Sequence, residues 1–287
     1  MQWPDGLRPT DERLEPALRA SDDYRADLTV EAVLRHVEGR RVTALATDGN
    51  AVVVVKVFHG PRARGNHRRL AALADAGLSD IVPASHGCDA SGHVGVVGHR
   101  PGVELPSVPD DVFVPACRRA GVALRRLHEC GAAFDREWTV DDELTQLRRR
   151  APDTVAHAIA EAATAAAQLA GAPLVPSHRD CHPRQLVVSD DHVAWIDLDD
   201  CALAPAGLDV GNMLAHLIRE HVTGRRSAQV TAAARAAFVE GYGGIEARSC
   251  RQWERLSLLR LAGLAETRHR SPAERDALLI ALGELSS

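Results

Sequence analysis

The chain has 287 residues, 45% of them hydrophobic and 25% charged, which is typical of soluble globular proteins with one large domain or two smaller lobes. A net charge of −5 argues against a general nucleic-acid binder. No apolar run is long enough to span a bilayer, residues 1–6 lack a signal-peptide pattern, and the six cysteines are scattered without a Cys-x-x-Cys pair. We therefore expect a cytoplasmic protein without membrane or nucleic-acid partners, a zinc ribbon or a disulfide scaffold.

The N-terminal part combines an expected helical extension with an expected β-hairpin. Residues 1–40 are polar and amphipathic, and predict helix starts at 11–14 and 29–34, with Thr29 as a possible cap. Residues 42–47 and 51–58 are rich in β-forming residues and are joined by an Asp-Gly turn, which favours a hairpin. Lys56 is the only charge in the second strand. Because that strand is apolar on both faces, an inward Lys56 would need a partner.

The remainder of the chain is predicted to change from short strands to helices. A helix is expected at about 67–76, with Asn66 as a possible cap and Gly77 as its stop, followed by short strands within 81–100. From about residue 116 the apolar spacing is helical up to Gly131. Further helices are predicted at 153–170, 209–220, 228–241, 247–268 and 272–284. The acidic residues between 135 and 143 are interpreted as a solvated loop and helix N-terminus, with an amine-binding site as the alternative.

The most informative stretch is 177–200. Two apolar runs, 186–188 and 193–196, flank Asp190-Asp191 and predict a second hairpin. This hairpin would bring Asp180, Gln185 and Asp197 to one end of a two-stranded ribbon. One carboxylate could take a proton there, while an amide oxygen and a second carboxylate hold a hard cation. Phosphoryl transfer requires such a set.

These residues resemble the His-x-Asp-x-x-x-x-Asn…Asp signature of the aminoglycoside phosphotransferase and choline kinase-like family. The matching residues are His178-Arg179-Asp180-Cys181-His182-Pro183-Arg184-Gln185, followed by Ile196-Asp197. The resemblance implies that Asp180 is the catalytic base, and that Asp197 and Gln185 bind Mg²⁺. The family usually has Asn at the position of Gln185, and Gln is longer by one methylene, about 1.5 Å.

The resemblance also implies roles for residues outside this stretch. Asp209, in Asp-Val-Gly-Asn, would brace the catalytic loop, and His128 and His178 would be structural. Lys56 would hold the α- and β-phosphates of ATP. Backbone groups at a hinge would bind the adenine edge; the hinge residues are Val97, Gly98 and His99. His182 and Asp199 remain open between site and scaffold, as do Glu240, Trp253, Glu254 and Glu266 between substrate pocket and core or surface.

The expected fold is α+β and protein-kinase-like, with a small β-rich N-lobe over residues 1–100 and a larger helical C-lobe over 101–287. ATP would lie between the lobes and transfer its γ-phosphate to a hydroxyl of a small molecule. Aminoglycoside-like antibiotics, sugars and amino alcohols all fit as acceptors, and the choice between ATP and GTP stays open, as does a role in antibiotic resistance.

Three alternatives remain. Gln185, the missing glycine-rich loop and the absence of a Glu in the helix after Lys56 are compatible with a catalytically weak or inactive kinase fold. His178-x-Asp180-x-His182 also has a spacing that a zinc hydrolase could use. Protein phosphorylation is disfavoured, because only a short segment separates Asp197 from Asp209 and no Ala-Pro-Glu follows it.

Overall fold

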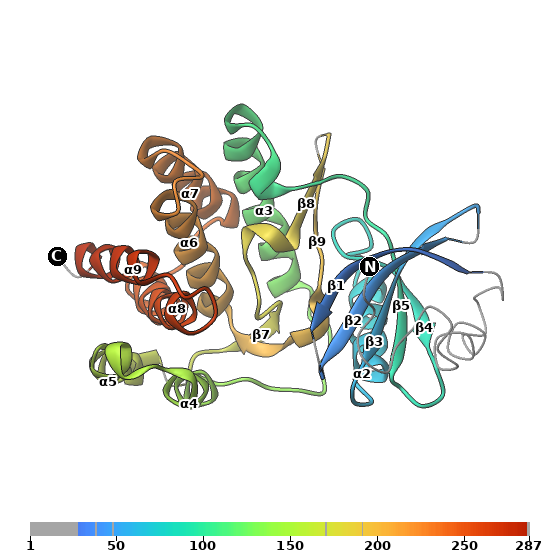
Figure 1. Cartoon of the computed structure of the whole chain (residues 1–287), viewed down its shortest axis with the longest axis horizontal. Coiled ribbons are helices and arrows are strands. Elements are labelled where there is room, and N and C mark those ends of the chain that lie inside the picture. Colours follow the sequence, from blue (N-terminus) through green and yellow to red (C-terminus); the bar gives the residue numbers. More distant parts are fainter. Residues whose placement is uncertain (1–27, 38, 48, 170, 191, 286–287) are drawn as a thin grey trace. The chain divides into compact units, whose positions relative to one another are not determined.

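The computed structural model describes residues 28–37, 39–47, 49–169, 171–190 and 192–285. The chain divides into two compact units, residues 1–101 and 102–287. Strands dominate the described part of the first unit and helices dominate the second (Figure 1), so the predicted α+β class with a β-rich N-terminal part and a helical C-terminal part is confirmed. No helix within the described ranges is long and apolar enough to cross a membrane.

The first unit is built on an antiparallel sheet with the order β1-β2-β3-β5-β4. Its elements are β1 (Thr29–Val37), β2 (Arg41–Thr47), β3 (Val52–Phe58), α2 (Ala63–Asp75), β4 (Ser85–Cys88) and β5 (Val94–Gly98). The predicted hairpin is confirmed, with Thr47 of β2 opposite Val52 of β3. Val53, Val55 and Val57 lie on one face of β3 in the buried core of this unit.

The predicted helix at 29–34 is wrong, because these residues form β1 and pair with β2. Two register irregularities, between Val30 and Ala32 and between Val33 and Arg35, explain the error. In a regular strand, residues three apart point to opposite faces, whereas an extra residue brings them to the same face. Val30 and Val33 both pack against the valine core. Their spacing therefore imitates that of a helix. The helix expected at 11–14 lies outside the described residues.

Helix α2 begins four residues before the predicted start, at Ala63, and Arg62 precedes it without a side-chain cap. The expectation that Asn66 caps this helix is wrong. Asn66 lies within α2, is buried, and accepts a hydrogen bond from Arg69 Nη2 at 2.6 Å. An intrahelical bond three residues apart thus satisfies the Asn side chain that sequence reasoning assigned to the helix terminus.

The second unit contains the predicted catalytic hairpin and a set of packed helices. Its strands are β6 (Val103–Glu104), β7 (Leu174–Ser177), β8 (Leu186–Ser189), β9 (His192–Trp195) and β10 (Ala202–Pro205). Its helices are α3 (Asp110–Glu129), α4 (Val140–Arg150), α5 (Asp153–Ala166), α6 (Ala206–Val222), α7 (Ala228–Tyr242), α8 (Ala247–Thr267) and α9 (Pro272–Glu284). The last three agree with prediction to within a residue, whereas α3 and α6 begin earlier than predicted and α5 ends before residue 170.

Helix α6 packs directly on α8, and a glycine makes this close approach possible. A Cβ atom at Gly211 would lie 2.5 Å from the backbone nitrogen of Glu254, so any other residue would push the helices apart. Trp253 of α8 is 1% exposed and belongs to a large apolar cluster of this unit. Of the two alternatives left open for Trp253, the structure therefore favours the core over the substrate pocket. All six cysteines are free thiols.

Two short antiparallel ribbons position the candidate site. In one, β8 pairs with β9 and places Leu186 opposite Trp195. In the other, β7 pairs with β10 and places Ser177 opposite Ala202. The chain runs from β7 through a loop into β8, and from β9 through a turn into β10. The two connecting segments are thus held at neighbouring ends of the ribbons.

Candidate active site

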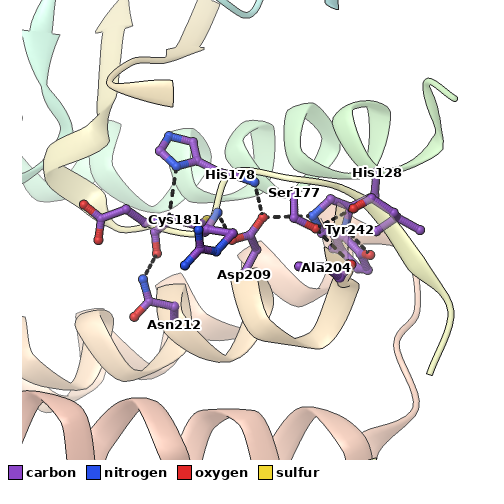
Figure 2. Close-up of polar contacts among 11 residues, drawn as sticks. His128, Ser177, His178, Cys181, Ala204, Asp209, Asn212 and Tyr242 are labelled. Atoms are coloured by element: carbon purple, nitrogen blue, oxygen red, sulfur yellow. Dashed lines mark hydrogen bonds and ion pairs between the residues drawn. The ribbon is translucent and has the colours of Figure 1, made fainter. Parts of the chain in front are cut away.

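The loop of residues 177–185, which joins β7 to β8, is braced from below by Asp209 in the first turn of α6 (Figure 2). Asp209 Oδ2 accepts a hydrogen bond from the backbone N–H of His178 at 2.6 Å, and Oδ1 accepts one from the N–H of Arg179 at 2.7 Å. The Asp209 side chain is fully buried. Paired backbone donors compensate for burying the carboxylate. The structural role predicted for Asp209 is therefore supported.

A buried chain of hydrogen bonds continues from Asp209 (Figure 2). His128 Nε2 lies 3.2 Å from Asp209 Oδ2, and His128 Nδ1 lies 2.8 Å from the Tyr242 hydroxyl. Because a carboxylate only accepts, Nε2 carries the proton and Nδ1 of the neutral ring accepts from Tyr242. Burial, with the nearby charge of Asp209, raises the pKa of Tyr242 to about 12, so its hydroxyl stays a donor.

His178 provides a second brace, between the loop and the end of β9. Its Nε2 lies 2.9 Å from the carbonyl oxygen of Ile196, and its Nδ1 accepts the N–H of Asp180 at 3.3 Å. The ring also meets Trp195 edge-on, with centroids 5.4 Å apart. Both ring nitrogens are occupied, so His178 is not available as a zinc ligand. The described residues also contain no group of three His, Cys, Asp or Glu side chains placed to hold a metal.

The side chains of Asp180 and Asp197 both approach that of Gln185, the third residue predicted for this end of the hairpin. Gln185 is buried in the short 3₁₀ turn before β8. Gln185 Nε2 lies 3.3 Å from Asp180 Oδ2 and 3.4 Å from Asp197 Oδ2. The hairpin thus brings together the two carboxylates and the amide that the sequence singled out. The amide nitrogen faces both carboxylates, because it is the donor of the amide group and carboxylate oxygens accept.

The chemistry of this set fits a hard cation. Two carboxylates converge on one side-chain amide, whose oxygen is also a ligand that Mg²⁺ accepts. Asp197 has φ 58° and ψ 46°, in the left-handed region that Asp tolerates better than most residues. This conformation turns the chain sharply after β9, between the end of the hairpin and β10.

Asp180 differs from Asp209 in its electrostatics. Burial alone would raise the pKa of Asp180, but the hydrogen bond from His182 and the charge of Arg260 hold that pKa well below the usual range. The carboxylate is therefore ionised near neutral pH and can accept a hydrogen bond from a hydroxyl group. The side chain of Asp180 is 42% exposed, so an incoming group can reach it.

The residues predicted to bind nucleotide lie in the first unit. Lys56 is 8% exposed in β3, opposite Thr43 and Gly95, as expected for an inward-pointing lysine. Helix α2 carries no acidic residue in its first turn. At the predicted hinge, the backbone N–H groups of Gly98 and His99 are paired within this unit, and nucleotide binding by backbone groups there stays a prediction. The Gly98 N–H donates to Ala84 at 2.8 Å, and the His99 N–H donates to Val52 at 3.3 Å. Val97 is paired within the sheet.

Several of the acidic residues considered for amine binding or for the substrate pocket have partners within the second unit. Glu254 is buried and pairs with Arg235 of α7, and Glu143 accepts the indole N–H of Trp138 at 2.9 Å. The other pairs are Glu240 with Arg118, Glu266 with Arg275, and Asp142 with Thr139 in a capping box. The interpretation of residues 135–143 as a loop and a helix N-terminus therefore agrees with the start of α4 at Val140.

Sequence reasoning missed two groups that approach the 177–185 loop from helix α6. Asn212 of α6 donates to the Cys181 carbonyl at 2.8 Å and accepts a hydrogen bond from Arg260 of α8 (Figure 2 shows the first contact). His216 of α6 stacks on His182 with ring centroids 4.6 Å apart. The helical spacing of Asp209, Asn212 and His216 places them on one face of α6. This spacing is the only signal in the sequence that could have identified Asn212 and His216.

Comparison with known proteins agrees with the motif. A profile of the phosphotransferase enzyme family matches residues 31–259, which is well over half of the chain. No curated protein sequence matches the chain significantly.

Solved structures of small-molecule kinases share the fold at low sequence identity. A glucosamine kinase in complex with glucosamine, ADP and inorganic phosphate is 22% identical, with a TM-score of 0.67 over 98% of this chain and 87% of that chain. An aminoglycoside phosphotransferase from Streptomyces rimosus in complex with ADP and streptomycin is 16% identical, with a TM-score of 0.58 over 76% and 90%. A choline kinase from Streptococcus pneumoniae is 15% identical, with a TM-score of 0.63 over 90% and 94%.

Proposed function

Because the chain belongs to the phosphotransferase enzyme family, we propose that it transfers the γ-phosphate of ATP to a hydroxyl group of a small molecule, with Asp180 as the base. The observation that carries the proposal is the convergence of Asp180 and Asp197 on Gln185. A base and a cation-binding pair at one end of a hairpin are what phosphoryl transfer requires, since its catalysis is mostly positioning and charge neutralisation.

Each residue then has one task. Asp180 is held by the N–H bond to His178 and accepts the hydroxyl proton late in the transfer. Asp197 and Gln185 would hold Mg²⁺, which supplies neutralisation of the phosphate oxygens when bound. Lys56 would hold the α- and β-phosphates. The ADP present in two of the similar kinase structures supports ATP as the co-substrate.

The test measures ADP release by the full chain with ATP, Mg²⁺ and a panel of acceptors. Glucosamine, streptomycin and choline are suitable probes, because the similar proteins are named for them or contain them. Asp180→Asn should reduce turnover by about 10²–10⁴-fold while MgATP binding, measured by calorimetry, is kept. Asp197→Asn should instead weaken nucleotide binding that depends on Mg²⁺.

Asp190→Asn is the matched control, because Asp190 is an exposed aspartate in the turn of the same hairpin. Its φ of 46° is tolerated by Asn, so turnover should stay at the parent level. Full turnover by Asp180→Asn would eliminate the base assignment. MgATP binding by the parent without ADP release for any probe would instead favour the kinase fold as a binding protein.

A further inference from the structure

The two carboxylate oxygens of Asp180 have different surroundings. Oδ2 lies 3.3 Å from Gln185 Nε2 and 3.5 Å from His182 Nε2. Within the part of the chain that the structure describes, no hydrogen bond reaches Oδ1. Because the side chain is 42% exposed, one oxygen is held by the protein while the other remains open to an acceptor.

The backbone determines where His182 carries its proton. The N–H of Arg184 lies 3.2 Å from His182 Nδ1, and a backbone N–H can only donate. Nδ1 must therefore accept, and the neutral ring carries its proton on Nε2. This nitrogen is the one beside Asp180 Oδ2. The hydrogen bond from Arg184 therefore favours the His182 tautomer whose N–H can donate to Asp180.

The ring of His182 is also fixed in orientation. It stacks on His216 of α6, with centroids 4.6 Å apart and an angle of 23° between the ring planes. The His182 side chain is only 14% exposed. Stacking from one side and the Arg184 hydrogen bond at the edge restrain the ring, so its Nε2 proton remains directed at Asp180.

We propose that His182 is a positioning residue, which with Gln185 holds Oδ2 of Asp180 so that Oδ1 faces the acceptor hydroxyl. Rotation of the carboxylate would exchange the two oxygens only by breaking both contacts. The 3.5 Å separation is at the outer limit for a hydrogen bond, and we expect it to shorten when an acceptor hydroxyl binds to Oδ1. The proton of the hydroxyl then passes to Oδ1, and the hydroxyl oxygen forms the bond to the γ-phosphorus while the bond to the ADP oxygen breaks.

Two substitutions distinguish the contribution of the His182 N–H donor from that of its aromatic ring. His182→Phe keeps an aromatic ring against His216 but removes the N–H, whereas His182→Gln restores an N–H donor. We expect His182→Phe to lower kcat for ADP release by about 10–100-fold with KM for ATP unchanged, and His182→Gln to recover part of the loss. The assay uses glucosamine, streptomycin and choline, with water as the acceptor where none of them stimulates release. The exposed His157→Phe is the matched control and should retain the parent rate.

A second readout needs no acceptor, and its first part needs only the parent chain. In the ¹⁵N-histidine-labelled parent chain, long-range ¹H–¹⁵N correlations should show His182 protonated at Nε2, and Asp180→Asn should shift that nitrogen. Protonation at Nδ1, or an unchanged kcat in a folded His182→Phe, would overturn the proposal. Because this role rests on Asp180 being the base, Asp180→Asn is assayed in parallel. Full activity of Asp180→Asn would refute the proposed function, whereas an inactive Asp180→Asn beside a fully active His182→Phe would refute only the positioning role.

Discussion

Asp180 and Asp209 are the same residue type on the two sides of one loop, and their surroundings give them opposite properties. Asp209 is fully buried, and both of its oxygens accept backbone N–H groups. Asp180 is 42% exposed, and its contacts with side-chain donors reach one oxygen only. The first carboxylate is saturated by the fold, whereas the second retains capacity for a ligand.

This difference implies that stability and catalysis are separable in this loop. Removing a saturated buried carboxylate leaves its donors unpaired, so the cost appears in the free energy of unfolding. Removing an exposed and partly satisfied one affects chiefly the groups that would bind there. Active sites often keep such incompletely satisfied groups at some expense of stability.

The largest expected effect tests this contrast directly. Asp209→Ala would leave the N–H groups of His178 and Arg179 without acceptors and His128 without its partner. We expect a loss of about 3–5 kcal/mol in the free energy of unfolding, measured by urea denaturation. Asp209→Asn, which keeps one acceptor oxygen, should lose less.

Asp180→Asn is the comparison variant for stability. It should change the free energy of unfolding by less than about 1 kcal/mol, because the side chain is partly solvated. If Asp209→Ala and Asp209→Asn lower the free energy of unfolding no more than Asp180→Asn does, the distinction between a structural and a catalytic carboxylate would be wrong.

The same contrast explains how much the sequence could predict. The sequence predicts that Asp180, Gln185 and Asp197 lie together, and they do. A hairpin is a local structure, so its ends meet whatever the rest of the chain does. The β1 strand was missed because two register irregularities give Val30 and Val33 a helical spacing. Such irregularities depend on pairing with β2, which periodicity in one segment does not report.

The support of the site was only partly predictable for a similar reason. Asp209 belongs to a short motif, so the brace was expected. The stacking of His216 on His182 and the bond from Asn212 to the Cys181 carbonyl depend on how α6 packs beneath the loop. Long-range packing of this kind leaves only helical periodicity as a signal in the sequence, and that signal does not identify the partner.

A smaller effect should appear in the pH dependence of stability. Burial, followed by the charge of Arg260, holds the pKa of His216 well below its usual 6.5, although Asp180 opposes the shift and Arg219 adds to it. The unfolded chain therefore binds a proton at pH values where the folded chain does not. Stability is retained above pH 6.5 and falls below it, by up to about 1.4 kcal/mol per pH unit from this group.

Urea denaturation at several pH values between 7.5 and 5 would measure this contribution. His216→Phe keeps a ring against His182 but cannot titrate, so its stability should fall less steeply with decreasing pH than that of the parent. His157→Gln, at an 89% exposed side chain on α5, should keep the parent slope. Equal slopes for the parent and His216→Phe would remove His216 as the source.

The smallest expected effect lies at the far end of the buried chain from Asp209. Tyr242→Phe removes the hydroxyl that donates to His128 Nδ1 at 2.8 Å, leaving a buried acceptor unpaired. We expect a loss of about 1 kcal/mol in the free energy of unfolding and an ADP-release rate within twofold of the parent. A double-mutant cycle with His128→Phe isolates the bond, because Tyr242→Phe should cost less once the acceptor is absent. An equal cost in both backgrounds would show that the Tyr242 hydroxyl contributes independently of its hydrogen bond to His128.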